Sequence, residues 1–315
     1  MITKSVNFII PYFGEFPNYM QLYLNSCKKN PEFHWTIITD NLKKYDYPEN
    51  VKVVYKTFEE VQRLVRSKFN FQVEINQPYK FCDMKPMYGY IFEDYNKGFD
   101  FWGYCDVDMI LGDLKSFIND EMLSYDKVFT QGHMTIMRNS DEMNTLFMRK
   151  IGGNELYKTV LQSENSFNFD EDFLDVVNIN TICRDNHISI WEEETIADIY
   201  TKASGFRRVL SSGFEKRSLN YYLWNDGKLI RRIKRGGNWY SEEYMYIHLQ
   251  KRKMKVSIGL ESTYFKIIPN EFAKLEISLD KIGQLDDNVK TKNINLHYFR
   301  LRFNNLKKKM RRRFN

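Results

Sequence analysis

The stretch FDFWGYCDVDMILGDL, residues 99–114, decides the predicted fold. Its apolar and aromatic residues 101–105 are typical of a buried β-strand, and this strand runs directly into Asp106-Val-Asp108. Parallel sheets bind their ligands outside the carboxyl ends of their strands. The two aspartates are therefore expected at the edge where such a sheet would hold a ligand.

Strand and helix patterns alternate on the N-terminal side of this stretch. Short apolar runs predict strands at residues 6–12, 35–39 and 51–55. Helical patterns are present at residues 18–28, 57–68 and 83–95. This alternation predicts an α/β protein with a mainly parallel sheet and helices on both of its faces.

The C-terminal half has a more mixed pattern. It predicts strands at 127–130, 134–138 and 244–249, a helix at 140–150 and a β-hairpin at 220–233. Asn225-Asp226-Gly227 is a strong turn signal inside that hairpin. Because no internal repeat or linker is evident, we expect one domain over residues 1–299 and a separate tail at 300–315.

Composition and motifs argue against several classes of protein. With 43% apolar and 28% charged residues, the chain is not expected to be disordered. Its four widely spaced cysteines favour reduced thiols in the cytosol over a zinc ribbon or a disulfide scaffold. Glycine-rich dinucleotide and phosphate-binding motifs are absent, and the apolar runs are too short for a signal peptide or a membrane span.

The positive charge is concentrated in the tail. The whole chain has a net charge of +6, but residues 300–315 contain eight Lys and Arg residues and no acid, which leaves −2 for the rest. We therefore expect a nearly neutral body that does not bind nucleic acid. Apolar residues between the cations indicate an amphipathic helix on an anionic membrane surface. Nucleic-acid binding, for which no recognisable module accompanies the tail, and a solvated chain end are the alternatives.

Asp106 and Asp108 are the most informative polar residues. Side chains two residues apart lie on the same side of an extended chain, so both carboxylates can reach one divalent cation. Hard oxygen ligands suit Mg²⁺ or Mn²⁺, which usually take further ligands from water or a substrate phosphate. A pair of solvated acids in a loop is the alternative.

Several segments together resemble those of a known family, small bacterial glycosyltransferases with the GT-A fold from capsule and surface-polysaccharide gene clusters. The matching segments are IIPYFGEFPNYMQLYLNSCKKNP (9–31), Thr39-Asp40, PYKFCDMKPMYGYIF (78–92), FDFWGYCDVDMILGDL (99–114), GHMTIMRN (132–139) and YIHLQKRKM (246–254). The resemblance implies transfer of a sugar from a nucleotide-diphosphate donor, with Mn²⁺ or Mg²⁺ bound at Asp106-Val-Asp108.

The resemblance also implies roles in donor binding. Ten residues are assigned to the nucleotide or donor sugar: Pro11, Tyr12, Phe13, Asp40, Lys80, Asp83, Lys85, Asp106, His133 and Lys251. Some have structural alternatives. Tyr12 and Phe13 can be core residues, Asp40 can cap a turn, and Asp83 can cap a helix with both neighbouring lysines in water.

His248 is implied as the third metal ligand, although the His-x-x-Gly-x-x-Lys motif of some related families is not present, and a hydrogen-bonded structural histidine is the alternative. Asp170 and Asp172 are the candidates for a general base at the acceptor hydroxyl, or alternatively an acidic helix N-terminus. An inverting transferase needs such a base and a retaining one does not, so the stereochemistry stays open.

The sequence thus predicts a metal-dependent glycosyltransferase that uses a nucleotide-sugar donor, expected to be a UDP-sugar. Its acceptor would be a surface-glycan precursor, free or lipid-linked, at the inner face of the cell membrane, where the enzyme would be a peripheral cytoplasmic protein. A sugar nucleotidyltransferase and a non-catalytic, membrane-associated binding protein are the alternatives. A nucleotidyltransferase normally has a glycine-rich segment after its first strand, where this chain has Pro11-Tyr-Phe-Gly-Glu15.

Overall fold

The computed structural model describes residues 2–172, 176–210, 212–250 and 252–275, together with 286, 289–292, 299, 303, 306 and 307. Backbone contacts divide the chain into two compact units, which we describe separately. Unit 1 comprises Met1–Phe16, Asn30–Asp106 and Lys115–Glu194, and unit 2 comprises Pro17–Lys29, Val107–Leu114 and Thr195–Asn315. Most of the basic tail lies outside the described residues.

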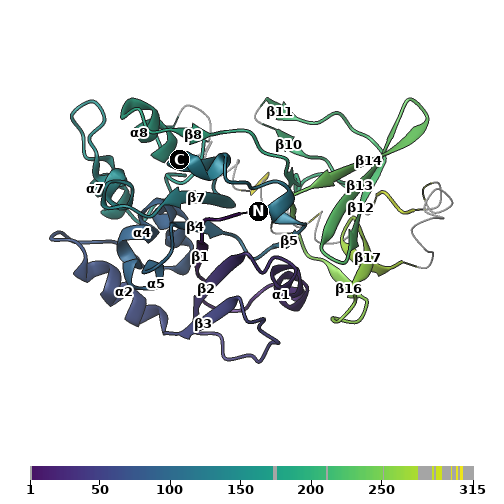
Figure 1. Ribbon diagram of the computed structural model, residues 1–315, viewed down its shortest axis with the longest axis horizontal. Coiled ribbons are helices and arrows are strands. Elements are labelled where there is room, and N and C mark those ends of the chain that lie inside the picture. Colours follow the sequence, from purple (N-terminus) through teal and green to yellow (C-terminus); the bar gives the residue numbers. More distant parts are fainter. Residues whose placement is uncertain are drawn as a thin grey trace. The chain divides into compact units, whose positions relative to one another are not determined.

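Unit 1 contains a seven-stranded sheet in the order β3-β2-β1-β4-β7-β6-β8 (Figure 1). Its strands are β1 (Val6–Pro11), β2 (Phe33–Thr39), β3 (Val51–Tyr55), β4 (Phe101–Cys105), β6 (Lys127–Gln131), β7 (Met134–Arg138) and β8 (Ile190–Trp191). Strands β3, β2, β1 and β4 are parallel, β7 is antiparallel to both β4 and β6, and β8 is parallel to β6. The predicted α/β class with a mainly parallel sheet is confirmed.

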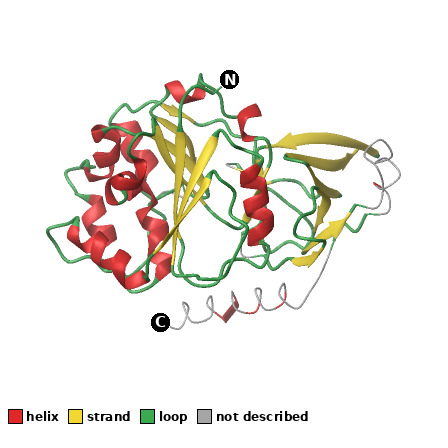
Figure 2. Ribbon diagram, turned by 60° about the horizontal axis from the view of Figure 1, so that its bottom comes forward, coloured by secondary structure: helices red, strands yellow, loops and turns green. Residues whose placement is uncertain are grey.

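The α-helices of unit 1 gather against one face of this sheet, so within this unit the prediction of helices on both faces is wrong (Figure 2). They are α2 (Phe58–Ser67), α3 (Phe81–Met84), α4 (Tyr88–Ile91), α5 (Glu93–Asn96), α6 (Asp141–Thr145), α7 (Leu156–Leu161) and α8 (Ile179–Asp185). Their apolar residues form one core with the sheet residues Ile9, Ile38, Trp102, Tyr104 and Met137.

The predicted continuous helix at 83–95 is wrong. A 3₁₀ turn at Lys85–Met87 interrupts it between α3 and α4. Pro86 has no backbone N–H to donate to the preceding turn, so the α-helical ladder stops there. The break leaves Lys85 buried, with its side chain directed to groups outside its own helix.

Unit 2 contains α1 (Met20–Lys28), a six-stranded sheet and two smaller sheets. The six-stranded sheet has the order β14-β13-β12-β17-β18-β16 and is built from β12 (Asn220–Asn225), β13 (Lys228–Arg235), β14 (Asn238–Tyr244), β16 (Lys255–Ser257), β17 (Tyr264–Ile268) and β18 (Glu271–Lys274) (Figure 1). The smaller sheets are β10 (Val209–Leu210) with β11 (Gly213–Phe214), and β5 (Met109–Leu111), β15 (Tyr246–His248) and β9 (Ala197–Asp198) in the order β5-β15-β9.

The predicted hairpin is confirmed. Asn225 of β12 pairs with Lys228 of β13, so Asp226-Gly227 forms a two-residue turn. Both residues have positive φ angles, +46° and +103°, as a type I′ turn requires. None of the helices formed by the described residues combines the length and apolar surface needed to span a bilayer.

Candidate functional site

The three-stranded sheet of unit 2 brings together three polar residues from distant parts of the chain. Asp108 directly precedes β5, His248 ends β15, and Asp198 ends β9. Strand β15 lies between the other two and pairs Met109 with His248 on one side and His248 with Asp198 on the other. Backbone hydrogen bonds from Leu249 N to Asp108 O (2.9 Å) and from Ile199 N to His248 O (3.0 Å) continue this pairing.

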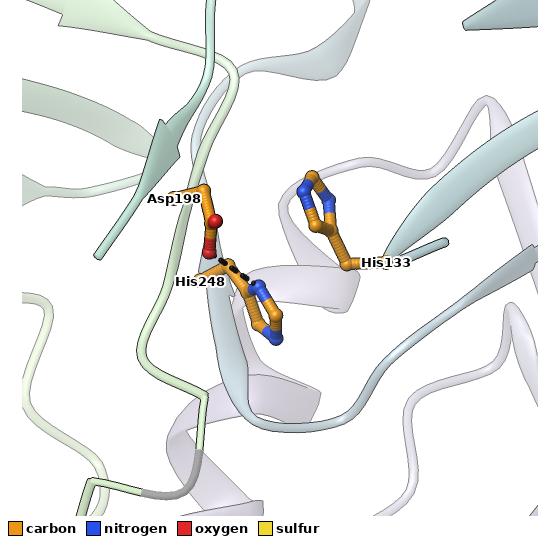
Figure 3. A group of neighbouring side chains, drawn as sticks. All are labelled: His133, Asp198 and His248. Carbon is orange, nitrogen blue, oxygen red and sulfur yellow. Dashed lines mark hydrogen bonds and ion pairs between the residues drawn. The ribbon is translucent and has the colours of Figure 1, made fainter. Parts of the chain in front are cut away.

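The side chains of these residues form a chain of contacts centred on His248. Its Nδ1 lies 2.8 Å from Asp198 Oδ1 (Figure 3), and its Nε2 lies 3.3 Å from Asp108 Oδ1. The imidazole is buried, which alone would lower its pKa, but the two carboxylates raise the pKa of His248 well above its ordinary value. Gln250 Nε2 donates a second hydrogen bond to Asp198 Oδ1 at 2.8 Å.

Asp108 and His248 fit a divalent cation. Their ligand atoms are close enough to share one ion, and a carboxylate oxygen with an imidazole nitrogen is a reasonable donor pair for Mn²⁺. The ring nitrogen that would not bind the ion is hydrogen-bonded to Asp198, as is usual for metal-ligating histidines. The sequence predicted Asp108 and His248, but it missed Asp198, which lies in a two-residue strand with no detectable pattern.

Asp106, the other predicted ligand, is the last residue of unit 1 in this part of the chain. It follows β4 directly, its N–H donates to His133 O at 3.0 Å, and its Oδ1 accepts a hydrogen bond from Lys85 Nζ at 2.8 Å. Since Asp106 and Asp108 are separated by one residue, covalent geometry alone keeps their Cα atoms within about 7 Å.

Lys85 is the centre of a buried charged cluster in unit 1. Besides Asp106, its ammonium group donates to Gly132 O (2.7 Å) and lies 3.6 Å from Asp170 Oδ2. Burial alone would lower the pKa of Lys85, but the carboxylates of Asp106 and Asp170 raise it well above the ordinary value. Burial raises the pKa of Asp170 to about 7, although Lys85 acts in the opposite direction.

Glycine is required at position 132 for this cluster to close. A Cβ atom at Gly132 would lie 2.5 Å from Asp170 Oδ2 and 2.9 Å from Glu171 Oε2. The Gly132 N–H also donates to Glu171 Oε2 at 3.2 Å. His133, the next residue and a predicted donor ligand, is buried and contributes its backbone carbonyl to Asp106.

Asp83 and Lys80 form a second buried pair. Lys80 Nζ lies 2.9 Å from Asp83 Oδ2 and donates to Asn165 O at 2.7 Å, and Asp83 Oδ1 accepts from Phe167 N at 3.0 Å. The alternative of a helix cap with both lysines in water is therefore wrong, because Asp83 lies within α3 and Lys80 and Lys85 are buried. Through these hydrogen bonds, the pair holds residues 165–167 beside the start of α3.

Asp172 differs from Asp170 in its surroundings. It forms an ion pair with Arg184 at 3.0 Å and accepts a hydrogen bond from Asn178 Nδ2 at 3.1 Å. Partial burial acts to raise its pKa, but these bonds, with Arg184 first, lower the pKa of Asp172 overall. Lys251, a predicted donor ligand, lies outside the described residues.

The remaining predicted residues follow the carboxyl ends of β1 and β2. Pro11 ends β1, and Tyr12 continues its pairing with a hydrogen bond to Ile38 O and stacks on Phe16 with a centroid distance of 4.8 Å. Phe13 packs on the aromatic core residues Phe58 and Phe81, as its structural alternative predicted. Asp40 is exposed, and its Oδ1 accepts from Gly14 N at 2.8 Å.

The fold and these clusters define an α/β protein whose polar residues follow the carboxyl ends of adjacent parallel strands, with a carboxylate–histidine–carboxylate group in its second unit. A model described as a family of unknown function (DUF6625) matches residues 8–276. The chain therefore belongs to this family. No curated protein matches the sequence.

Proposed function

We propose that the protein is a metal-dependent glycosyltransferase of the GT-A type. It would transfer a sugar from a nucleotide-diphosphate donor, expected to be a UDP-sugar, to a surface-glycan precursor at the inner face of the membrane. The observation that carries this proposal is the contact of His248 with Asp108 on one ring nitrogen and with Asp198 on the other. This arrangement is characteristic of a histidine prepared to bind a metal ion.

Asp108 and His248 would hold Mn²⁺ or Mg²⁺, and Asp106, two residues before Asp108 in the chain, is the third ligand that the sequence predicts. When bound, the ion would neutralise negative charge that develops on the leaving diphosphate. Lys85 supports this role by holding one oxygen of Asp106 through a charge-assisted hydrogen bond. Tyr12 and Asp40 follow the ends of the two neighbouring strands and are partly buried and exposed, respectively, and in this proposal they would contact the nucleotide base and ribose.

Of the two candidate general bases, the contacts favour Asp170. A base works best when its pKa lies near the working pH, and burial brings the pKa of Asp170 to about 7. Asp172 is instead held by Arg184, which stabilises its ionised form and makes it a weaker base. The proposed contact of the basic tail with anionic lipid would bring the enzyme to a lipid-linked acceptor.

The proposal is tested by calorimetric titration of UDP into the purified protein with and without Mn²⁺. We expect UDP binding that depends on Mn²⁺ and is lost in Asp108→Asn, which keeps side-chain volume but removes a charged ligand. Asp226→Asn is the matched control, because it makes the same charge change at the hairpin turn of unit 2. Equal UDP binding by Asp108→Asn and the unaltered protein would exclude Asp108 from the site.

A further inference from the structure

We infer that Asp198 is a positioning residue that orients His248 so that Nε2 faces Asp108, where the two residues would share a divalent cation. The inference rests on the proposed function, since it names a residue that acts on the proposed metal centre through one of its ligands. Three sets of contacts lead to it: the backbone pairing of β9 with β15, the hydrogen bond on Nδ1, and a second donor on Asp198 itself.

The backbone places the two side chains together. Asp198 and His248 are partners in the parallel pairing of β9 with β15, and the Ile199 N–H donates to His248 O at 3.0 Å. Side chains of paired residues project from the same face of a sheet, so this register brings the carboxylate beside the imidazole.

The hydrogen bond determines which ring nitrogen carries the proton. An ionised carboxylate can only accept, so Nδ1 must donate its proton to Asp198 across the 2.8 Å contact. A cation that binds at Nε2 takes the place of the proton there, and Nδ1 keeps its proton on Asp198 while Nε2, which faces Asp108 at 3.3 Å, supplies the lone pair. Without Asp198, the ring would lose both its orientation and its preference for this tautomer.

Asp198 is itself held in place. Gln250 Nε2 donates to the same oxygen, Oδ1, at 2.8 Å, and the backbone of Gln250, two residues after the end of β15, adopts a positive φ of +53°. The Asp198 side chain is 13% exposed, so it has limited freedom to turn away from the imidazole. Asp198 is therefore held in place to hydrogen-bond the ring nitrogen of His248 that would not bind the metal ion.

The experiment measures the Mn²⁺ affinity of the full chain from the electron paramagnetic resonance signal of free Mn²⁺. The variants are Asp198→Asn, His248→Gln, the double variant, and the control Asp226→Asn. We expect Asp198→Asn to weaken Mn²⁺ binding about 10- to 100-fold in the unaltered background and to cause no further loss beside His248→Gln. Pulsed measurements on bound Mn²⁺ should detect coupling to an imidazole nitrogen that diminishes in Asp198→Asn, whereas the control should match the unaltered protein.

The outcomes separate this inference from the proposed function. If the protein binds Mn²⁺ and Asp198→Asn binds it equally well, the inference is overturned and the metal centre stands. The inference is also overturned if Asp198→Asn reduces the Mn²⁺ affinity equally in the unaltered protein and in His248→Gln, because Asp198 would then act independently of His248. If the unaltered protein does not bind Mn²⁺, both the inference and the proposed function are overturned. If Asp198→Asn does not fold, Gln250→Ala replaces it in the experiment. A weaker Mn²⁺ affinity of Gln250→Ala supports the inference, and an unchanged affinity overturns it.

Discussion

At the scale of single residues, removal of the Lys85 side chain should reduce stability strongly. Its buried ammonium group contacts Asp106 at 2.8 Å and Asp170 at 3.6 Å. Lys85→Met would leave these carboxylates without their cation, and removing one partner of a buried ion pair costs about 3–5 kcal/mol. We expect urea unfolding to show a decrease of this size in the free energy of unfolding.

Lys97→Met is the matched control for this prediction. Lys97 also forms an ion pair with an aspartate, Asp94, but both side chains are exposed. Surface ion pairs contribute little because water and salt screen them. We expect no measurable change in stability, and equal effects of Lys97→Met and Lys85→Met would contradict the role assigned to the buried cluster.

Asp170 should give the protein a specific pH dependence. Burial raises the pKa of its carboxyl to about 7 in the folded state, so the folded chain retains a proton that the unfolded chain has lost. The contribution of this group to stability is therefore fully present below about pH 4 and is lost as the pH rises through 7. Asp170→Asn, which resembles the protonated form, should become progressively more stable relative to the unaltered protein between pH 4 and pH 8.

The measurement is chemical unfolding of both proteins at several pH values across this range. A constant difference in the free energy of unfolding would show that the pKa of Asp170 is the same in the folded and unfolded states. A difference that grows towards low pH would also contradict the prediction, because it would mean that the folded state favours the ionised carboxylate.

The sequence identified only part of the candidate site, because the other residues are placed by contacts between segments that are distant in the chain. Asp108 was predicted because it follows an apolar strand, and His248 because the resemblance implies a histidine there. Asp198 gave no signal, since its position is set by a pairing between strands 50 residues apart in sequence. The burial of Lys80 and Asp83 was missed likewise, because their partners at residues 165–167 are distant in sequence.

At the scale of secondary-structure elements, the hairpin turn offers a direct test. Gly227 has a φ of +103°, and a Cβ at this position would also approach Lys29 Cβ to 3.1 Å. Gly227→Ala should therefore destabilise the protein by about 1–2 kcal/mol. Asp226→Asn should have a much smaller effect, because asparagine accepts the φ of +46° at that position. Thermal unfolding distinguishes the two, and equal midpoints would contradict the assigned turn.

Elements with strong local signals were predicted well. Strand β3 has the predicted ends, and α2 begins with a capping box in which Thr57 and Glu60 satisfy each other's backbone N–H groups. The helix at 83–95 was predicted as continuous because Pro86 was placed in its first turn, whereas α-helical residues in fact begin at Phe81. Strands of two residues, such as β8 and β9, are too short for any periodic pattern.

At the scale of the whole molecule, the division into two units was not evident from the sequence. Each unit is assembled from three separate segments, and one boundary falls between Asp106 and Val107. This boundary, inside Asp106-Val-Asp108, has neither the glycine nor the proline that often marks a linker. We expected one domain over residues 1–299 because no linker is recognisable in the sequence.

The basic tail gives a prediction for the whole chain. Eight cations within residues 300–315 should bind anionic vesicles, with Lys and Arg near the surface contributing about 1 kcal/mol each. We expect the full chain to sediment with vesicles rich in anionic lipid, and a chain ending at residue 299 to remain in the supernatant. Equal sedimentation of the two chains would exclude the tail as the membrane contact.

The central claim is sugar transfer from a nucleotide diphosphate, and a donor panel tests it most directly. The purified full chain is incubated with Mn²⁺ and each of several sugar nucleotides, and release of the nucleoside diphosphate is measured with and without a chelator. We predict release from at least one donor, highest for a UDP-sugar, that stops when the chelator is added. No release from any donor, or release of pyrophosphate from a nucleoside triphosphate instead, would contradict the claim.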